Sequence, residues 1–329
     1  MNTEDLKLIV REKYAEIAKN SLIKVQYSCC GNSNCCEESD FSMIGDEYTN
    51  VAGHNADADL GLGCGIPTQY ADIQVGYSVL DLGSGAGNDC FVARAIVGET
   101  GKVTGIDFTD AMTEKARANN AKLGYSNVEF IQGDIEEMPF SDNQFDVIVS
   151  NCVLNLVPDK QKAFSEMYRV LKPRGRLVLS DPTCETAMPE NLKTDDRLRA
   201  LCLSGAMPLK DYITMITDVG FGTVEIRAKR PYRILDPLNY KTDELIYIES
   251  VEVCAIKDSM PEDGPCVFTG KTAIYYGTED FFDDKKGHTL LKNQPLSICD
   301  KTANALNSAN REDIFISEST FFYDGGGCC

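Results

Sequence analysis

The sequence contains no tryptophan and only two histidines, His54 and His288. No run of apolar residues comes near the roughly 18 that a membrane-spanning helix needs. The first seven residues, MNTEDLK, lack the basic and apolar regions of a signal peptide. These absences predict a cytoplasmic protein with no membrane partner. We expect His54 to be a loop residue rather than a catalyst.

Positive charge is also scarce. The chain of 329 residues has 32 Lys and Arg against 51 Asp and Glu, which gives a formal net charge of −19. Such a chain repels a phosphate backbone, so we expect no nucleic-acid partner. The hydrophobic content of 43% and the charged content of 25% are ordinary for globular proteins, and the length corresponds to about two domains.

Cysteine, by contrast, is abundant, with 14 residues in a chain without an export signal. A reducing compartment keeps thiols free, so metal binding or redox chemistry is favoured over a disulfide framework. The clustered cysteines are Cys29, Cys30, Cys35 and Cys36 near the start, and Cys328 and Cys329 at the end. The first cluster has enough thiolates for a four-ligand zinc site, although its spacing differs from the usual repeated C-x2-C pair.

The order of short and long apolar segments predicts an α/β fold. Residues 4–19 repeat at helical spacing, and residues 188–221 look helical around Cys202 and at Tyr212–Val219. Short Val-, Ile- and Leu-rich strands alternate with helices from residue 78 to residue 180, which is typical of a parallel, doubly wound sheet covered on both faces. Segments such as Ile246–Ile256 after Pro231 are β-rich. We therefore predict three parts: a helix and Cys-rich loops (1–70), an α/β domain (71–230) and a smaller β-rich domain (231–329).

A glycine loop follows the first predicted strand of this region, in the sequence Val79-Leu-Asp-Leu-Gly-Ser-Gly-Ala-Gly-Asn-Asp89. Its glycines allow a sharp turn and a close approach of the backbone to a ligand at a helix N-terminus. Asp107 ends the next strand, about 20 residues later, where a carboxylate can accept from both hydroxyls of a ribose. Asp134 follows the third strand, where it can accept from an adenine amino group. The G-x-G-x-G spacing differs from the dinucleotide fingerprint G-x-G-x-x-G.

These motifs, with Gln144–Ser150 and Leu171–Asp181, resemble the class I S-adenosylmethionine-dependent methyltransferases over about residues 70–185. The resemblance implies a Rossmann-like fold that binds S-adenosylmethionine. The cofactor-binding residues that we expect are Asp81, Gly83, Ser84, Gly85, Asp107, Asp134, Ile135 and Asn151.

Three single cysteines lie where a methyl acceptor could bind. Cys152 follows the fourth strand, at the end of the sheet where open α/β folds bind their ligands. Cys64 lies in a glycine-rich loop upstream, and Cys202 lies downstream of the fifth strand. A lone cysteine is more often a small buried hydrophobe. We keep that interpretation for the other single cysteines, which are Cys90, Cys184, Cys254, Cys266 and Cys299.

With these cysteines the chain resembles the arsenite S-adenosylmethionine methyltransferases over nearly its whole length. The motifs are Gly61-Leu-Gly-Cys-Gly65, the glycine loop through Cys90, Thr104–Asp107, Ser150–Lys160 and Cys202–Ala206. The family's three arsenic-binding cysteines fall on Cys64, Cys152 and Cys202. For a fourth, N-terminal cysteine, the spacing to Cys64 favours Cys35 or Cys36, and the spacing from the first helix favours Cys29; we assign it to Cys36.

The resemblance implies that three thiolates hold trivalent arsenic, a soft atom that prefers sulfur. Its lone pair would attack the activated methyl group, so no protein base is needed. Because the arsenic becomes pentavalent, a thiol reductant of the thioredoxin or glutathione type is expected. Two alternatives are a methyltransferase for another small acceptor and a non-catalytic thiol buffer. The three matching cysteine contexts disfavour the first alternative, and the glycine loop with Asp107 and Asp134 disfavours the second.

Overall fold

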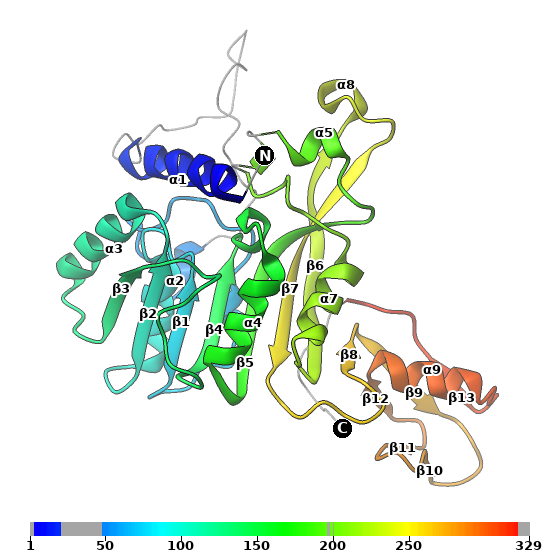
Figure 1. The fold of residues 1–329 in the computed structure, drawn as a ribbon. Coiled ribbons are helices and arrows are strands. Elements are labelled where there is room, and N and C mark those ends of the chain that lie inside the picture. The colour runs from blue at the N-terminus through cyan, green and yellow to red at the C-terminus, as the bar shows by residue number, and fades with distance from the viewer. Residues whose placement is uncertain (1–2, 21–47, 196–197, 200, 322–329) are drawn as a thin grey trace.

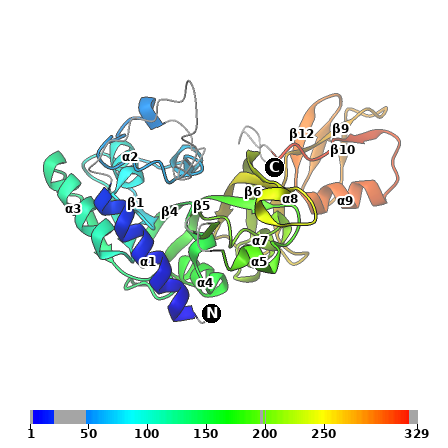
Figure 2. The ribbon, with the colours of Figure 1, turned by 90° about the horizontal axis from the view of Figure 1, so that it is seen from above.

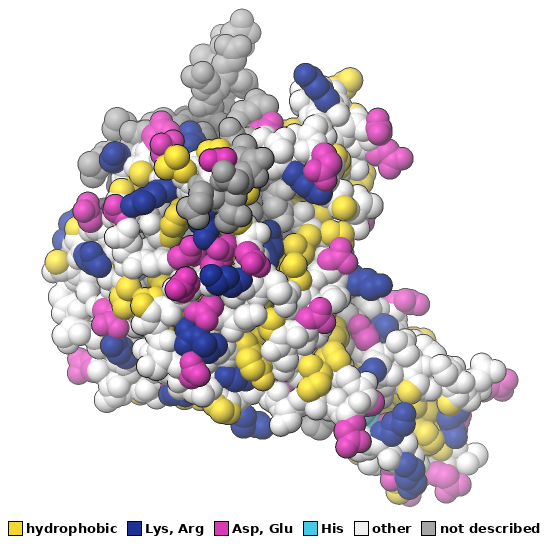
Figure 3. Space-filling model, in the orientation of Figure 1, with side chains coloured by type: hydrophobic (Ala, Val, Ile, Leu, Met, Phe, Trp, Pro, Cys, Tyr) yellow, Lys and Arg dark blue, Asp and Glu magenta, His cyan; other side chains and the backbone are white. Residues whose placement is uncertain are grey.

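The computed structural model describes residues 3–20, 48–195, 198–199 and 201–321. Its first element, helix α1 (Thr3–Asn20), confirms the helix predicted from the apolar spacing and lies against α3 (Asp110–Leu123) (Figures 1 and 2). No helix among the described residues is long and apolar enough to cross a membrane. Acidic and basic side chains are interspersed on the face drawn in Figure 3.

An eight-stranded sheet forms the centre of the molecule, in the order β3-β2-β1-β4-β5-β7-β6-β8. The first five strands in this order run parallel, as the alternation of strands and helices predicted. They are β3 (Val128–Gln132), β2 (Lys102–Asp107), β1 (Ser78–Leu82), β4 (Phe145–Asn151) and β5 (Leu171–Cys184). The class I methyltransferase fold is thereby confirmed.

Helices cover both faces of this sheet because side chains alternate along each strand. Leu80 and Leu82 of β1 pack on the face that α4 (Lys160–Val170) and α7 (Leu209–Asp218) cover. Val79 packs on the opposite face, against α2 (Asn88–Val97) and α3. Figure 2 shows the two helical layers on either side of the strands.

The sheet continues past Pro231, where we predicted a domain boundary. That residue lies inside β6 (Thr223–Leu235), and Ile246–Ile256 is β7, an antiparallel strand between β5 and β6. The edge strand β8 (Cys266–Phe268) pairs in parallel with β6. The segment assigned to the C-terminal domain therefore contributes two strands to the main sheet. The division into three domains itself stays a prediction.

The C-terminal part begins after β8 and has its own small core. A three-stranded sheet, in the order β12-β9-β13, packs against helix α9 (Asp300–Ser308) around Ala273, Leu290 and Ala303. Its strands are β9 (Lys271–Tyr275), β12 (Pro295–Ile298) and β13 (Ile314–Ile316), with a hairpin of β10 (Phe281–Asp283) and β11 (Thr289–Leu291). The remaining short elements are η1 (Tyr48–Asn50), η2 (Pro67–Tyr70), η3 (Leu154–Leu156), α5 (Glu190–Lys193) and α8 (Pro237–Tyr240).

Candidate functional site

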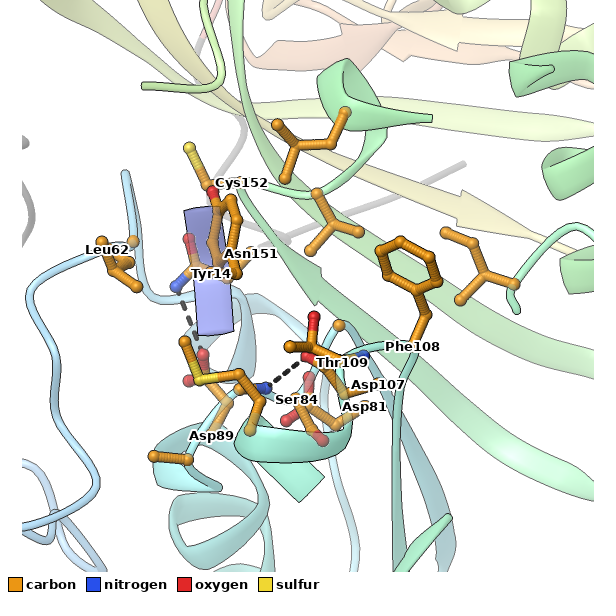
Figure 4. A pocket seen from close by; sticks show the side chains of 18 of the residues that line it. Tyr14, Leu62, Asp81, Ser84, Asp89, Asp107, Phe108, Thr109, Asn151 and Cys152 are labelled. Carbon is orange, nitrogen blue, oxygen red and sulfur yellow. Dashed lines mark hydrogen bonds between the residues drawn. The ribbon is translucent and has the colours of Figure 1, made fainter. Parts of the chain in front are cut away.

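A cavity opens at the carboxyl ends of β1, β2 and β4, beside the glycine loop. It contains about 1170 Å³ of empty space, counting the part open to solvent. All eight residues that we predicted to bind a cofactor line it: Asp81, Gly83, Ser84, Gly85, Asp107, Asp134, Ile135 and Asn151. Figure 4 shows Asp81, Asp89 and Asp107 on one side of the cavity and Cys152 on the other.

Asp107 is fixed beneath the glycine loop by two backbone groups. The N–H of Gly85 donates to Oδ2 at 3.0 Å, and the N–H of Thr109 donates to Oδ1 at 2.8 Å. Gly85 has a φ of +52°, a left-handed conformation that glycine adopts without steric cost. Burial raises the pKa of Asp107, and these two N–H groups partly oppose the rise. The loop and the carboxylate therefore hold each other in place at the cavity wall.

Negative charge is concentrated deeper in the cavity. Asp81 is buried and accepts from the Cys90 thiol at 3.2 Å. Burial, with the nearby carboxylates of Asp89 and Asp107, raises the pKa of Asp81 well above its usual range. The enclosed position of Asp89 raises its pKa to about 6, although this carboxylate accepts from the Tyr48 hydroxyl at 2.6 Å. Closely spaced carboxylates of this kind favour a ligand with positive charge.

Helix α1 reaches the opposite rim of the cavity. The ammonium of Lys7 lies 2.6 Å from Asp134 and 2.5 Å from Glu136, and Arg11 pairs with Asp110 of α3. The carboxylate that we predicted to accept from adenine is therefore paired with a lysine. Lys7 and Tyr14 of α1 also line the cavity. The sequence reading missed this contribution because nothing local in an amphipathic helix shows where its polar face will lie.

The structure brings Cys64, Cys152 and Cys202 together. All three are buried in one cluster, and the Cys152 thiol lies within hydrogen-bond range of the other two thiols. The carbonyl of Ser180, on β5, accepts from the backbone N–H of Cys152 at 2.7 Å and from the Cys64 thiol at 3.3 Å. The Cys202 thiol donates to the carbonyl of Cys152 at 2.9 Å. Cys152 is thus the central member and the one that lines the cavity.

Two of these cysteines have an unusual backbone. The φ angles of Cys152 and Cys202 are +62° and +61°, in the left-handed region that costs a non-glycine residue about 1–2 kcal/mol. Cys202 lies in a turn, so the predicted helix around it is wrong, whereas α7 confirms the helix predicted at Tyr212–Val219. Its carbonyl accepts from the Asn155 side chain at 3.0 Å, and a Cβ on Gly205 would collide with the Asn155 carbonyl. Tertiary contacts rather than helical propensity determine the backbone conformation of this segment. Backbone strain of this kind is typical of functional sites.

Asn151 joins the cavity to the Cys64 loop. Its Oδ1 accepts from the N–H of Cys64 at 3.0 Å, and its Nδ2 donates to the carbonyl of Gly65 at 2.8 Å. A Cβ on Gly65 would collide with Glu252 and Ser180, so only glycine allows this loop to approach so closely. The amide that we predicted to bind a cofactor therefore also positions a cysteine.

The surroundings of Cys64 and Cys152 keep these two thiols protonated. Burial raises the pKa of Cys64, and burial together with its neighbouring thiols raises the pKa of Cys152 well above the usual range. Two tyrosines that the sequence reading missed approach the thiols. Burial and the nearby thiols raise the pKa values of Tyr14 and Tyr232, and the Tyr232 hydroxyl has no hydrogen-bond partner within the part of the chain described.

The three thiols lie close together, but they are not already arranged to bind one shared atom. In the described ranges no group of three or more His, Cys, Asp or Glu side chains is arranged to hold a metal ion. Cys64 and Cys202 direct their thiols toward carbonyl groups, so a shared ligand requires these side chains to rotate. Cys36, which we assigned as a fourth ligand, lies outside the described residues, as do Cys29, Cys30, Cys35, Cys328 and Cys329. His54 pairs with Asp59 at 3.0 Å in a loop.

Comparison with curated proteins supports the family that the cysteine motifs suggested. Residues 73–236 match a family model described as a methyltransferase domain. The chain is 41% identical to an arsenite methyltransferase of Halobacterium salinarum over 69% of this chain and 60% of that protein. It is 38% identical to an arsenite methyltransferase of Mus musculus over 55% of this chain and 49% of that protein. The chain thus spans about half to three-fifths of these relatives' length.

A solved structure gives a more complete match. The crystal structure of CrArsM, an arsenic (III) S-adenosylmethionine methyltransferase from Chlamydomonas reinhardtii, is 32% identical in sequence, with a TM-score of 0.55. The match covers 79% of this chain and 91% of that one. The chain belongs to the arsenite S-adenosylmethionine methyltransferase family.

Proposed function

We propose that this chain transfers methyl groups from S-adenosylmethionine to trivalent arsenic held by Cys64, Cys152 and Cys202. The observation that carries the proposal is the position of Cys152. Its thiol contacts both other thiols, and the residue also lines the acidic cavity. An acceptor bound by these thiols is therefore already beside the cofactor pocket, which supplies the proximity that such a reaction needs.

Protonated, buried thiols suit this substrate. Arsenous acid, As(OH)3, is uncharged and reacts with three thiols to give As(SR)3 and three molecules of water. Each thiol proton leaves with an arsenic hydroxide, so no net charge is created inside the protein, where an unpaired charge is costly. The raised pKa of Cys64 and of Cys152 is then no obstacle to binding. A neutral substrate is also not attracted or repelled by the net charge of −19.

The cavity residues fit S-adenosylmethionine. When bound, this cofactor supplies a methyl group activated by its sulfonium charge. Asp107 would accept from the ribose hydroxyls and Asp134, beside Ile135, from the adenine amino group. Asp81 and Asp89 would balance the cofactor's positive charge. The glycine loop supports this fit, since Gly83 and Gly85 line the cavity with positive φ angles that let the backbone approach a ligand closely.

The protein's contribution to the reaction is position. Three sulfur ligands hold trivalent arsenic as a pyramid, and its lone pair is the nucleophile. Bond formation to carbon leaves the arsenic oxidised by two electrons, so each turn needs two electrons from outside. We propose a thiol reductant of the thioredoxin or glutathione type, and a cytoplasmic location, which the composition of the chain supports.

The proposal is tested by incubating the full chain with arsenite, S-adenosylmethionine and glutathione, and separating the arsenic species by liquid chromatography with elemental detection. We expect methylated arsenic to form in proportion to S-adenosylhomocysteine. Omission of S-adenosylmethionine is the control. If arsenic stays bound to protein but unmethylated, the chain is a thiol buffer. If neither binding nor methylation occurs, the acceptor is another small molecule.

Cofactor affinity should depend on pH through Asp89. Its pKa is raised to about 6, so the side chain is a carboxylate above that pH and uncharged below it. We expect the Kd of S-adenosylmethionine to rise as the pH falls from 7 to 5, because a favourable charge beside a cation is lost. Calorimetric titration measures this.

S-adenosylhomocysteine, which lacks the sulfonium charge, is the matched control and should respond less to pH. Asp89→Asn keeps the size of the side chain and should remove most of the pH dependence. An equal response of both ligands would contradict this role of Asp89.

A further inference from the structure

A second pair of thiols lies far along the chain from the three cysteines of the proposed site. Cys266 begins the edge strand β8, and Cys299 caps the N-terminus of helix α9. Cys299 is buried with Phe268, and Cys266 packs against both, with its thiol within hydrogen-bond range of the Cys299 thiol. Neither residue lines the cavity. Figure 1 shows β8 and α9 next to each other at the junction of the main sheet with the C-terminal part.

The two thiols differ in access to solvent. Cys266 is only half-buried, whereas Cys299 is 2% exposed. Exchange between a thiol and a disulfide needs one sulfur that an outside reagent can reach and a second that resolves the mixed disulfide. Cys266 fits the first role and Cys299 fits the second.

Polar groups surround the pair. The ammonium of Lys301 pairs with the carboxylate of Asp263 at 2.5 Å and with the carbonyl of Gly264 at 2.8 Å, and Asp263 together with the two nearby sulfurs raises its pKa. Burial and the neighbouring Cys299 thiol raise the pKa of Cys266, and Lys301 partly opposes this rise because a cation beside a thiol favours the thiolate that attacks a disulfide. On the inner side, the Cys299 sulfur lies 3.2 Å from the hydroxyl of Thr302, which lies 3.5 Å from Nε2 of His288. This chain of groups offers the buried thiol a route for its proton.

We propose that Cys266 and Cys299 form a dithiol–disulfide pair that exchanges with low-molecular-weight disulfides of the glutathione type. The Cys266 thiolate attacks the disulfide RSSR, which gives a mixed disulfide and releases RS⁻. Cys299 then attacks the Cys266 sulfur, forms the intramolecular disulfide and releases the second RSH after losing its own proton. Two electrons pass from the protein to RSSR, and atoms balance. The product cross-links the edge of the main sheet to the C-terminal part.

The test uses the full chain and neither arsenite nor S-adenosylmethionine, so its outcome is independent of the proposed methylation. The reduced protein is equilibrated with mixtures of reduced and oxidised glutathione, quenched with acid, blocked with N-ethylmaleimide and mapped by mass spectrometry after proteolysis. We expect a cross-linked peptide containing Cys266 and Cys299, lighter by two hydrogen atoms than the separate peptides, which dithiothreitol abolishes. Cys254, a buried cysteine of β7, is the internal control and should remain a blocked thiol.

Single variants separate the two roles. In Cys299→Ser, the glutathione adduct should accumulate on Cys266, because nothing resolves it. In Cys266→Ser, the buried Cys299 should remain a thiol. The wild-type map decides the question even where a variant folds poorly. If both cysteines stay thiols in the most oxidising mixture, or if Cys266 keeps glutathione in the wild type without a cross-link, the proposal is wrong.

Discussion

Replacing Cys152 by serine should lower the rate of arsenite methylation by about 100-fold or more, the loss expected when a reacting atom is misplaced by about 1 Å. Serine keeps the size of the side chain but offers a hard oxygen in place of a soft sulfur. Cys152 contacts both other thiols and lines the cavity, so it is the ligand that ties the arsenic to the cofactor. The measurement is single-turnover formation of methylated arsenic.

Cys184→Ser is the matched control for this variant. Cys184 is buried in the same cluster, at the end of β5, but does not line the cavity. We expect this variant to methylate arsenite at nearly the wild-type rate. Both variants should bind S-adenosylmethionine with unchanged Kd, which shows that the fold is intact. If Cys152→Ser keeps normal turnover, the three-thiol mechanism fails.

Cys64→Ser and Cys202→Ser should each reduce arsenite methylation to a similar degree. Monomethylated trivalent arsenic binds one thiol fewer than arsenite does. Comparing the two substrates therefore shows which cysteines each one needs. We expect loss at Cys152 and Cys202 to persist with this substrate. The region of Cys35 and Cys36 should then become dispensable. Equal losses at every cysteine with both substrates would indicate a general effect on folding instead.

The cofactor half of the site could be read from the sequence because its determinants are local. Gly85 follows one strand and Asp107 ends the next strand, which pairs with the first in parallel. Chain connectivity therefore places Asp107 close to Gly85. Lys7 could not be found in this way. Its pairing with Asp134 depends on how α1 packs against the distant helix α3, and an amphipathic pattern does not specify that partner.

The positions of the cysteines also depend partly on contacts between distant segments, which the local sequence does not specify. The position of Cys152 followed from the end of β4, but residues around Cys202 have helical spacing while tertiary contacts with Asn155 place them in a turn. Cys266 and Cys299 look like isolated buried hydrophobes in the sequence. They meet only because β8 extends the main sheet and α9 packs beside it. The segment Ile246–Ile256 was predicted to be β-rich, and it is β7, but β-rich patterning does not say which sheet a strand joins.

Asp107→Ala is the cofactor-site change with the largest expected effect. A hydrogen bond to a charged group contributes about 1.5–3 kcal/mol, so losing the ribose acceptor should raise the Kd of S-adenosylmethionine by about 10- to 150-fold. The same change leaves the N–H groups of Gly85 and Thr109 without their acceptor, which loosens the glycine loop and should lower Tm as well. Calorimetric titration and thermal unfolding measure the two effects.

Asp110→Ala is the control for the charge that Asp107→Ala removes. Asp110 begins the helix that follows Asp107, pairs with Arg11 and does not line the cavity. It carries the same charge, so a long-range electrostatic effect would weaken binding in both variants. We expect a change of less than about threefold in this control, as for the loss of an exposed ion pair. If the Kd in Asp107→Ala is also unchanged, the ribose does not bind at Asp107, and the cofactor must lie elsewhere in the cavity.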